Sequence, residues 1–530
     1  MVQLISFLGF TAVVAVISYF ATRKTKENTN DGYFLGGRSL TGVVIAGSLL
    51  LTNLSTEQIV GLNGAAYKEG ILVMAWETLA AIAIVVTAIV LLPRYLKSGI
   101  TTVPQFLEER YDKTTKTITS VLFLSGYMIV LLPIVLYSGA LAINTMFGIP
   151  ELLGVSDTAA LWISVWGIGI IGSVYAVFGG LKAVAVSDTI NAVGLLTGGL
   201  LIPYFGLLAV GDGSLSEGWN TLVTANPAKF NSIGGSDASV PFSTIFTGMM
   251  LVQLFYWGTN QAIIQRALGA KNLKEGQKGL LLAAFVKILI PFIVVIPGII
   301  AFQLFKGSPL ENADQAYPLL VSKVLPVSLI GFFAAVLFGA VLSSFNSALN
   351  SSSTLFGLDI YKAYINKEAT EKQTVKVSKL FGIVLALFSM TIAPFIANAP
   401  NGLFGYLQEV NGCYSIPILT IILVGYITRY VPAVAAKIAI ISGVVLYSIS
   451  QFLLKPFVFG EANYPHYLHV MAILFVINII VMLLIGYFKP MKQPYIQKYS
   501  HDVDIKPWKF LYVTGGIIVL IVLSIYRYFS

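Results

Sequence analysis

The stretch LTNLSTEQIVG, residues 51–61, places hydroxyl, amide and carboxyl side chains directly after the apolar run GVVIAGSLL. Polar side chains of this kind compete with the helical backbone for hydrogen bonds, which favours a local break in a helix. A break frees carbonyl oxygens, and oxygen atoms are the ligands that hard cations prefer. At helical spacing Leu54 and Gln58 share one face, while Asn53 and Glu57 share an adjacent one. The two faces predict two tasks for one segment, binding and attachment to neighbouring helices.

The composition defines the class of protein. Of the 530 residues, 56% are hydrophobic and 11% are charged, and the mean hydropathy is +0.83. A soluble globular protein needs more polar surface than this, so we predict an integral membrane protein. The single cysteine, Cys413, excludes a disulfide framework and a cysteine-based metal site. The three histidines lie in the last 65 residues, away from every motif considered below.

Fourteen apolar runs are long enough to cross a bilayer, which predicts an all-α polytopic membrane protein with about 14 transmembrane helices. They lie near residues 4–22, 42–61, 71–93, 118–142, 160–178, 189–210, 243–265, 280–304, 327–356, 377–398, 403–428, 434–456, 467–488 and 510–528. The first run precedes the basic sequence TRKTK, so we expect a retained helix with its N-terminus outside. The C-terminus is then outside as well.

The distribution of basic residues supports this orientation. With both termini outside, 26 of the 33 Lys and Arg residues lie in cytoplasmic loops and six lie in outer segments. The positive-inside rule predicts such a bias. The net charge of +9 therefore reflects membrane topology and requires no nucleic-acid partner.

Few ionisable groups fall inside the apolar runs. The main ones are Glu57, Glu77 and Lys287, and Glu409 lies near the start of the eleventh run. A charged side chain at the bilayer centre costs about 2.5–3.5 kcal/mol on insertion scales, and such residues usually serve a cavity or a partner. The alternative is that one carboxylate only pairs with Lys287 to hold two helices together.

A second polar interruption, LVQLFYWGTNQAIIQR, lies in the seventh run. This run follows the second by five, so the two cross the membrane in opposite directions. Interrupted helices at matching positions of two inverted halves are typical of transporters with a site at the bilayer midplane. We predict one transmembrane domain, 1–530, with discontinuous helices and a five-plus-five core. Its inverted repeats would span 42–210 and 243–428, with peripheral helices at 4–22 and 434–528.

The ninth run contains a third polar element, GAVLSSFNSALNSSST. Its hydroxyl side chains form a stripe at helical spacing: Ser343 or Ser344, Ser347, Ser351 and Thr354. Small hydroxyl residues often serve helix packing alone, but they also offer neutral oxygen ligands to Na⁺. Binding of Na⁺ is the favoured interpretation if this helix lies against the break in the second run.

Four stretches carry a family resemblance: YAVFGGLKAVAVSD, FYWGTNQAIIQRALGAK, SSFNSALNSSSTLFGLDIYK and LTNLSTEQIVG. Together they resemble the sodium/solute symporter family, and within it the bacterial sodium/galactose transporters. The resemblance extends from about residue 30 to residue 430. It implies a Na⁺-coupled symporter that imports a sugar by alternating access. The implied location is the plasma membrane, which in a bacterium is the inner membrane.

The resemblance also implies roles for individual residues. The Na⁺ site would comprise the carbonyls of Leu51, Leu54 and Ala340 and the hydroxyls of Ser343 and Ser344, with Asp188 on the exit path. The sugar site would comprise Gln58, Glu77, Lys287 and Gln408, with Asn53 and Gln253 beside them. Tyr256 would stack on the sugar as the inner gate, backed by Trp257. The outer gate would comprise Leu62, Trp76 and Phe404.

Three positions depart from the family's galactose transporter, because Ala80 replaces a Ser, Gln253 an Asn and Trp76 a Tyr. Such changes alter which sugar hydroxyls the site satisfies, and unpaired polar groups discriminate strongly between substrates. We therefore expect a neutral galactose- or glucose-like monosaccharide or a related polyol. A carboxylate substrate is disfavoured, because we expect no Arg at mid-membrane depth.

Two alternatives remain open. The same fold could carry another small solute with Na⁺, such as an amino acid, a nucleobase or a vitamin. From a different class, the chain could be a membrane solute sensor, although the segment after the thirteenth run has only about 20 residues for an output domain. No nucleophile, base or metal constellation typical of an enzyme is evident, so we expect no enzymatic activity. The expected partners are Na⁺, a small neutral sugar and the lipid bilayer.

Overall fold

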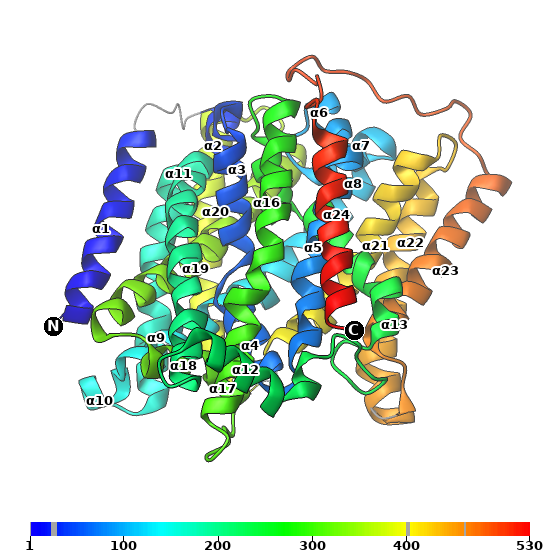
Figure 1. The fold of residues 1–530 in the computed structure, drawn as a ribbon. Coiled ribbons are helices and arrows are strands. Elements are labelled where there is room, and N and C mark those ends of the chain that lie inside the picture. The colour runs from blue at the N-terminus through cyan, green and yellow to red at the C-terminus, as the bar shows by residue number, and fades with distance from the viewer. Residues whose placement is uncertain (1, 23–28, 399–402, 461–462) are drawn as a thin grey trace.

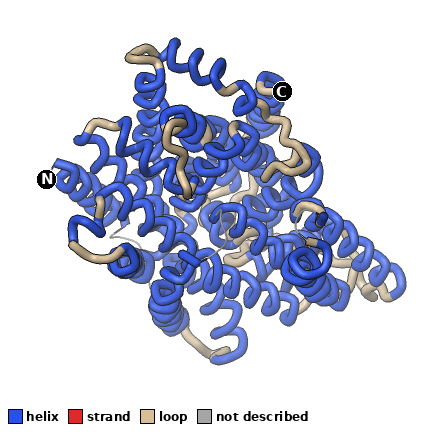
Figure 2. The backbone as a smooth tube through the Cα atoms, turned by 90° about the horizontal axis from the view of Figure 1, so that it is seen from below, coloured by secondary structure: helices blue, strands red, loops and turns tan. Residues whose placement is uncertain are grey.

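The computed structural model describes residues 2–22, 29–398, 403–460 and 463–530, and helices dominate these ranges (Figure 1). β pairing within the described ranges is confined to one isolated bridge between Leu40 and Ala270. Figure 2 shows the bundle from below, with helices joined by loops. The prediction of an all-α membrane protein is confirmed. Residues 23–26, which carry most of the TRKTK sequence, lie outside the described residues.

The helices of the first part of the chain are α1 (Val2–Thr22), α2 (Asn30–Phe34), α3 (Gly42–Asn53), α4 (Thr56–Glu69), α5 (Ala75–Val86), α6 (Leu92–Ser98), α7 (Val103–Arg110), α8 (Lys113–Gly126), α9 (Leu132–Phe147), α10 (Ile149–Leu153) and α11 (Asp157–Val210). The later ones are α12 (Leu215–Ala225), α13 (Phe242–Thr244), α14 (Met250–Gly258), α15 (Gln261–Leu268), α16 (Leu273–Val294), α17 (Ile296–Leu304), α18 (Ala316–Val324), α19 (Val327–Thr354), α20 (Glu371–Ile392), α21 (Leu403–Ile427), α22 (Ala433–Ile449), α23 (Tyr467–Phe488) and α24 (Leu511–Tyr528). Among the shorter segments, π-helical turns continue five of these helices: η3 (Thr87–Leu91), η4 (Tyr127–Leu131), η6 (Ile245–Met249), η8 (Leu355–Ile365) and η10 (Ser450–Phe459).

The number of membrane spans differs from the predicted fourteen. Within the described residues, eleven helical segments are long and apolar enough to cross a membrane, and the bent pair α3 and α4 adds a twelfth. The first predicted run forms α1, whose apolar part, Ile5–Ala21, is shorter than each of these eleven segments. The seventh run, 243–265, is divided among α13, η6, α14 and α15. The count of fourteen is therefore not confirmed, because one run is short and another is broken into several pieces.

The polar stretch at residues 51–61 breaks its helix as predicted. The axes of α3 and α4 are bent by 58°. Leu54 caps α3 with a ψ of 55°, and Ser55 is extended, with a ψ of 179°. The last turn of an α-helix leaves carbonyl groups without intrahelical partners. The break therefore exposes backbone oxygens inside the bundle.

The second polar interruption also breaks its helix. α14 ends at Gly258, and α15 begins at Gln261. Asn260 lies between them as the N-cap of α15, and its side chain accepts a hydrogen bond from Ala262 N. Asn is a favoured N-cap residue because its side-chain oxygen accepts a hydrogen bond from a free backbone amide of the first turn.

Alternate loops of the chain meet at one end of the bundle, here called the basic end. There Arg38 Nη2 donates a hydrogen bond to Gly99 O at 2.6 Å. Lys437 Nζ lies 2.8 Å from Asp112 Oδ2. Burial by itself would raise the pKa of Asp112, but hydrogen bonds from Lys437 and Thr115 outweigh it and hold this pKa below its ordinary value. The remaining loops gather at the opposite end, where Ser232 N donates to Phe529 O at 2.8 Å.

The linker between α23 and α24 crosses the basic end (Figure 1). Its backbone donates from Tyr495 N to Arg429 O and from Ser500 N to Lys97 O, both at 2.9 Å. Gly99 has a φ of +68°, and a Cβ there would lie 2.3 Å from Asp502 Oδ2. Glycine is therefore required where the linker approaches the α6 terminus. The linker thus ties α24 to the same end as the basic loops.

Candidate functional site

The centre of the bundle holds a buried group of four polar side chains from α3, α4, α5 and α16. Lys287 Nζ donates hydrogen bonds to Glu77 Oε2 and to Asn53 Oδ1. Gln58 Nε2 donates to the other carboxylate oxygen, Glu77 Oε1. Glu77 and Lys287 are fully buried, and Gln58 and Asn53 are 7% and 8% exposed. We call these four residues the central cluster.

Within the central cluster, the charges of Glu77 and Lys287, which are costly to bury in a membrane, compensate each other. A buried ion pair persists only when its remaining hydrogen-bonding groups are also satisfied. Here both carboxylate oxygens of Glu77 accept a hydrogen bond, and Asn53 provides a second acceptor for Lys287. The ion pair alone would also fit the helix-holding alternative. The additional contacts from both sides of the first helix break extend it beyond a simple link between α5 and α16.

The partner of Lys287 is Glu77, whereas Glu57 has no role in the pair. Glu57 Oε2 is buried and has no hydrogen-bond partner among the described residues, and the same holds for Thr56 Oγ1. Both atoms lie at the start of α4, where the helix resumes after the break. The alternative in which Glu57 pairs with Lys287 is therefore excluded in this conformation.

Aromatic residues of α14 surround the central cluster on one side. Lys287 Nζ lies 5.3 Å from the centre of the Trp257 ring, within the range of a cation–π interaction. Trp257 Nε1 donates to Gln253 Oε1 at 3.2 Å, and Gln253 Nε2 donates to Trp76 O at 2.9 Å. The ring of Tyr256 lies 5.3 Å from that of Trp257 and is half-buried. Gln253 therefore supports the wall of the cluster through Trp257.

Gln408 is the predicted sugar-site residue that the structure does not join to the central cluster. It lies on α21 and is half-buried. Within the described part of the chain it forms no hydrogen bond with the four cluster residues. Its place in the site remains a prediction.

The three predicted outer-gate residues pack together on the other side of the first break. The rings of Trp76 and Phe404 meet edge to face at 5.1 Å, and Leu62 is fully buried in the same apolar cluster. Gly61 lies directly against Phe404, since a Cβ at Gly61 would be 2.6 Å from Phe404 Cβ. α4 thus packs directly against α21 beside this apolar contact.

The hydroxyl stripe of α19 lies against the first break, as the Na⁺ interpretation required. Ser344 Oγ donates to Thr52 O at 2.7 Å, and Ser343 Oγ lies 3.5 Å from Thr52 Oγ1. The predicted carbonyl ligands belong to residues that are at most 1% exposed: Leu51, Leu54 and Ala340. The chain thus brings neutral oxygen atoms of α3 and α19 together, a donor set that suits a hard cation such as Na⁺.

Asp188 lies one step farther toward the basic end. Ser48 Oγ donates to Asp188 Oδ2 at 2.6 Å. Arg266 Nε donates to the same Ser48 hydroxyl at 3.3 Å, and Arg266 Nη2 donates to Ser347 Oγ. Arg266 is fully buried, although its position after an apolar run suggested a loop residue. The sequence pattern did not reveal the hydrogen bonds that Arg266 donates to the surrounding hydroxyl groups.

The second helix break is held by two tyrosines that the sequence analysis did not single out. Tyr95 OH donates to Gly258 O at 3.0 Å, so the last carbonyl of α14 is satisfied. Tyr127 OH donates to Asn260 Oδ1 at 2.6 Å and accepts from Ala262 N at 3.0 Å. A π-helical turn at η4 begins at Tyr127, and such turns often occur at functional positions. That turn cannot be read from hydrophobic periodicity.

Two discontinuous helices, a buried charge pair and a hydroxyl-lined break together define a membrane transporter with a site in the middle of the bundle. The model of the sodium:solute symporter family matches residues 33–444. The chain therefore belongs to this family, and it is a sodium-coupled symporter and not an enzyme. The resemblance noted from the four sequence stretches is confirmed.

Relatives and solved structures agree with this assignment. The chain is 50% identical to an uncharacterized symporter of Escherichia coli over 99% of this chain and 90% of the relative. It is 33% identical to a sodium/glucose cotransporter of Vibrio parahaemolyticus, with 84% of both chains covered. Its fold is similar to that of a Na⁺-coupled sialic acid symporter, with a TM-score of 0.78, 22% identity, and coverage of 93% of this chain and 99% of that one.

Proposed function

We propose that this chain imports a neutral, polyhydroxylated solute, a monosaccharide or a related polyol, together with Na⁺. The observation that supports this most is the central cluster. Glu77 provides acceptors, Lys287 provides donors, and the amides of Gln58 and Asn53 provide both. Opposite charges compensate each other within the cluster, so a neutral substrate with several hydroxyl groups fits it better than an ion.

The aromatic wall supports the same class of substrate. The ring of Tyr256 offers an apolar face to the C–H side of a pyranose, while the central cluster offers polar partners to its hydroxyls. Arg266, the buried cation that a carboxylate substrate would need, already donates to Ser48 and Ser347. Relatives named for glucose and myo-inositol transport also favour a sugar or polyol over an amino acid, nucleobase or vitamin.

In this proposal Na⁺ binds between the first break and α19. Its ligands are the carbonyls of Leu51, Leu54 and Ala340 and the hydroxyls of Ser343 and Ser344, with Asp188 on the route to the basic end. The ion and the solute then share one discontinuous helix, which supplies Leu54 to the ion and Gln58 to the solute. Coupling requires that both ligands favour the same state of this segment.

The proposal includes the membrane orientation and the division of the chain. The basic end faces the cytoplasm, both termini lie outside, and residues 42–210 and 243–428 form the inverted repeats. One Na⁺ crossing 100 mV releases about 2.3 kcal/mol. At about 1.4 kcal/mol per tenfold, this voltage alone concentrates a neutral solute about 40-fold. The plasma membrane, for a bacterium the inner membrane, supplies such a gradient.

Uptake into proteoliposomes tests the proposal. The purified chain is reconstituted, and labelled glucose, galactose and myo-inositol are supplied with an inward Na⁺ gradient, with a K⁺ gradient as the control. We expect uptake that requires Na⁺ for at least one of these solutes. A competition panel of unlabelled amino acids, nucleobases and vitamins distinguishes the alternatives. Na⁺-driven uptake of a labelled member of that panel, without uptake of glucose, galactose or myo-inositol, would contradict the sugar assignment.

A further inference from the structure

The short helix α15 carries a row of buried amide and guanidinium side chains that neither the ion site nor the solute site uses. α15 is the half of the second broken helix that leads from Tyr256 and Trp257 toward the basic end. Gln261, Gln265 and Arg266 are all fully buried. Arg266 faces Ser48 and Ser347, as described above, whereas the two glutamines form a separate network.

Gln265 joins α15 to two other elements at once. Its Nε2 lies within hydrogen-bond distance of Phe34 O at 2.8 Å, Thr354 Oγ1 at 3.0 Å and Asn350 Oδ1 at 3.1 Å. Its Oε1 accepts from Ser351 Oγ at 2.7 Å. One side chain therefore fastens α15 to α2 and to the end of α19 that lies beyond the hydroxyls of the ion site.

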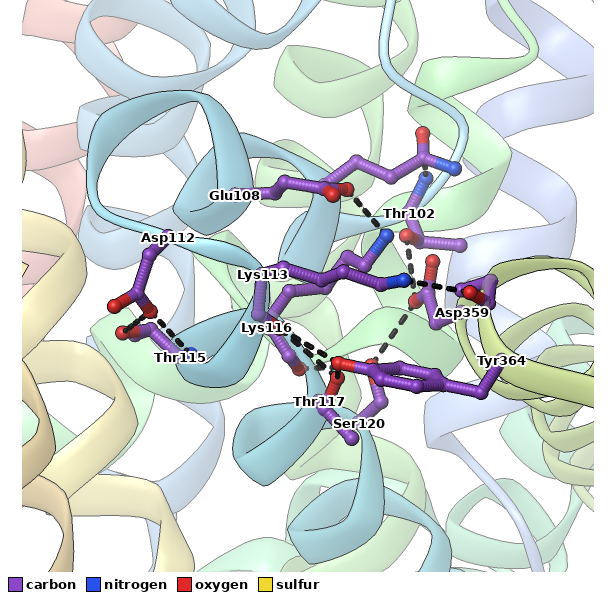
Figure 3. A network of polar contacts seen from close by, with 12 residues as sticks. Thr102, Glu108, Asp112, Lys113, Thr115, Lys116, Thr117, Ser120, Asp359 and Tyr364 are labelled. Atoms are coloured by element: carbon purple, nitrogen blue, oxygen red, sulfur yellow. Dashed lines mark hydrogen bonds and ion pairs between the residues drawn. The ribbon is translucent and has the colours of Figure 1, made fainter.

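Gln261 extends this network to the segment before α7. Gln261 Oε1 accepts from Val103 N at 2.8 Å, and its Nε2 lies 3.3 Å from Thr101 O. The neighbouring Thr102 donates to Asp359 Oδ2 at 2.9 Å, and Ser120 donates to the same atom at 3.0 Å. Figure 3 shows Thr102, Ser120 and Asp359 meeting where α7, α8 and η8 come together. Gln261 thus connects α15 to the segment before α7, and Thr102 of that segment connects it to Asp359 of η8.

The position of this network decides its role. Between the first break and the basic end, α11 and α15 each pack against α3 and α19. Ser48, Asp188, Arg266 and Ser347 occupy the part of this region nearest the ion site, and the Gln265 contacts with Asn350, Ser351 and Thr354 follow one turn farther along α19. The contact between Trp76 and Phe404 is apolar, whereas Gln265 contacts α2 and α19 through hydrogen bonds.

We propose that Gln265, supported by Gln261, is the positioning residue that closes the cytoplasmic exit, and that release of ion and solute requires these hydrogen bonds to break. This inference rests on the proposed direction of transport. Intramolecular hydrogen bonds contribute little net free energy because water replaces them on exposure. A polar closure therefore opens by exchanging its partners for water, while α15 swings about the break at Gly258.

Thiol accessibility tests whether the hydrogen bonds of Gln265 close the cytoplasmic exit; these hydrogen bonds are called the lock below. The native thiol is removed with Cys413→Ser, and Ser347→Cys introduces a reporter between the ion site and the Gln265 contacts. Inverted membrane vesicles then present the basic end to a membrane-impermeant maleimide. Gln265→Leu keeps the side-chain size but removes its polar atoms. We expect labelling to accelerate about tenfold, which corresponds to about 1.4 kcal/mol.

Gln277→Leu is the matched control, because Gln277 is also a buried glutamine near the basic end but bonds to Ala88 O and Trp508 N. The control should label at the rate of the reporter protein. Three outcomes would overturn the lock. They are equal labelling of all three proteins, equal acceleration in both glutamine variants, and labelling only in right-side-out vesicles. If Gln265→Leu does not yield a monodisperse protein, Ser351→Ala removes one donor and should accelerate labelling about threefold; an unchanged rate contradicts the proposal.

The labelling rate does not depend on which solute is carried. Faster labelling of Gln265→Leu without Na⁺-driven sugar uptake by the unsubstituted chain would overturn the proposed substrate and leave the lock standing. Normal sugar uptake with unchanged labelling would overturn the lock and leave the proposed substrate standing.

Discussion

The two helix breaks of this transporter differ in how their polar groups are satisfied. At the second break, Tyr95, Tyr127 and Asn260 provide partners for the carbonyl of Gly258 and for the first turn of α15. At the first break, Thr56 Oγ1 and Glu57 Oε2 are buried and have no hydrogen-bond partner among the described residues. Buried polar groups normally have partners, so each exception needs an explanation.

The difference suggests a division of labour between the breaks. A satisfied break keeps its geometry without a ligand and suits a hinge, on which α15 turns. An incompletely satisfied break gains more from a ligand that supplies the missing partners. We therefore propose that the ion and the solute bind at the first break and that movement occurs at the second. Substitutions at the first break should then change affinities, and substitutions at the second should change rates.

The largest expected effect comes from the charge pair beside the first break. Lys287→Ala leaves the buried carboxylate of Glu77 without its counter-charge, and breaking a buried ion pair costs about 3–5 kcal/mol. We expect Na⁺-driven uptake to fall below detection. Lys455→Ala is the control, because Lys455 pairs with Glu409 at 2.8 Å in a more exposed place. Uptake near normal in Lys287→Ala would remove the central cluster from the solute site.

The next effect concerns the ion. Ser344→Ala removes a hydroxyl proposed to bind Na⁺, and it also removes the donor to Thr52 O. The Na⁺ concentration for half-maximal uptake should rise about tenfold, equivalent to about 1.4 kcal/mol, with little change in the maximal rate at saturating Na⁺. Ser352→Ala is the control on the same helix, since Ser352 Oγ has no hydrogen-bond partner within the described residues. An unchanged Na⁺ dependence would assign the stripe to helix packing.

A smaller effect of the opposite kind is expected at the second break. Tyr127→Phe removes the hydroxyl that bridges Asn260 and Ala262 N. Ala262 N keeps Asn260 Oδ1 as its acceptor, so the variant loses only the net contribution of ordinary hydrogen bonds, about 0.5–1.5 kcal/mol each, and the melting temperature and the maximal uptake rate should fall slightly. The Na⁺ concentration for half-maximal uptake should stay the same. A shift in that concentration as large as the one in Ser344→Ala would contradict the division between the breaks.

The smallest effect is expected away from both breaks. Lys437→Ala removes the partner of Asp112 at the basic end, and exposed ion pairs contribute only about 0–1 kcal/mol. The pKa of Asp112 is lowered in the folded protein, so the pair stabilises the fold above the ordinary pKa and loses this effect as the pH falls through the lowered value. Melting temperatures of the variant and the unsubstituted protein should differ by the same small amount from pH 5 to pH 8. A difference that grows within this window would contradict the assignment.

The sequence was informative where the chemistry is costly in a membrane. Glu77 and Lys287 could be selected because charges are rare in apolar runs, and both breaks could be predicted because clustered polar side chains interrupt hydrophobic periodicity. The sequence could not show that the stripe with Ser343 and Ser344 contacts the first break, so the interpretation as a Na⁺ site depended on that contact. The pairing of Lys287 with Glu77 instead of Glu57 depends on how helices distant in the chain pack.

Other features had no signal in a single sequence. Tyr127 lies in an apolar run and Tyr95 just after one, and their roles at the second break depend on tertiary contacts. Arg266 follows the seventh run and Gln265 ends it, so neither position indicated that these side chains are buried against α19. The span count could not be fixed either, because the polar interruption predicts a break in the seventh run but not its division among α13, η6, α14 and α15.

The central claim is that Na⁺ and the solute share the first break, and equilibrium binding tests it most directly. Binding of a labelled sugar identified by the uptake assay is measured on detergent-purified protein at increasing Na⁺ concentrations. The account predicts that Na⁺ tightens sugar binding, that Ser344→Ala shifts this enhancement to higher Na⁺, and that Tyr127→Phe leaves it unchanged. Sugar affinity that does not depend on Na⁺ in the unsubstituted protein would contradict the account.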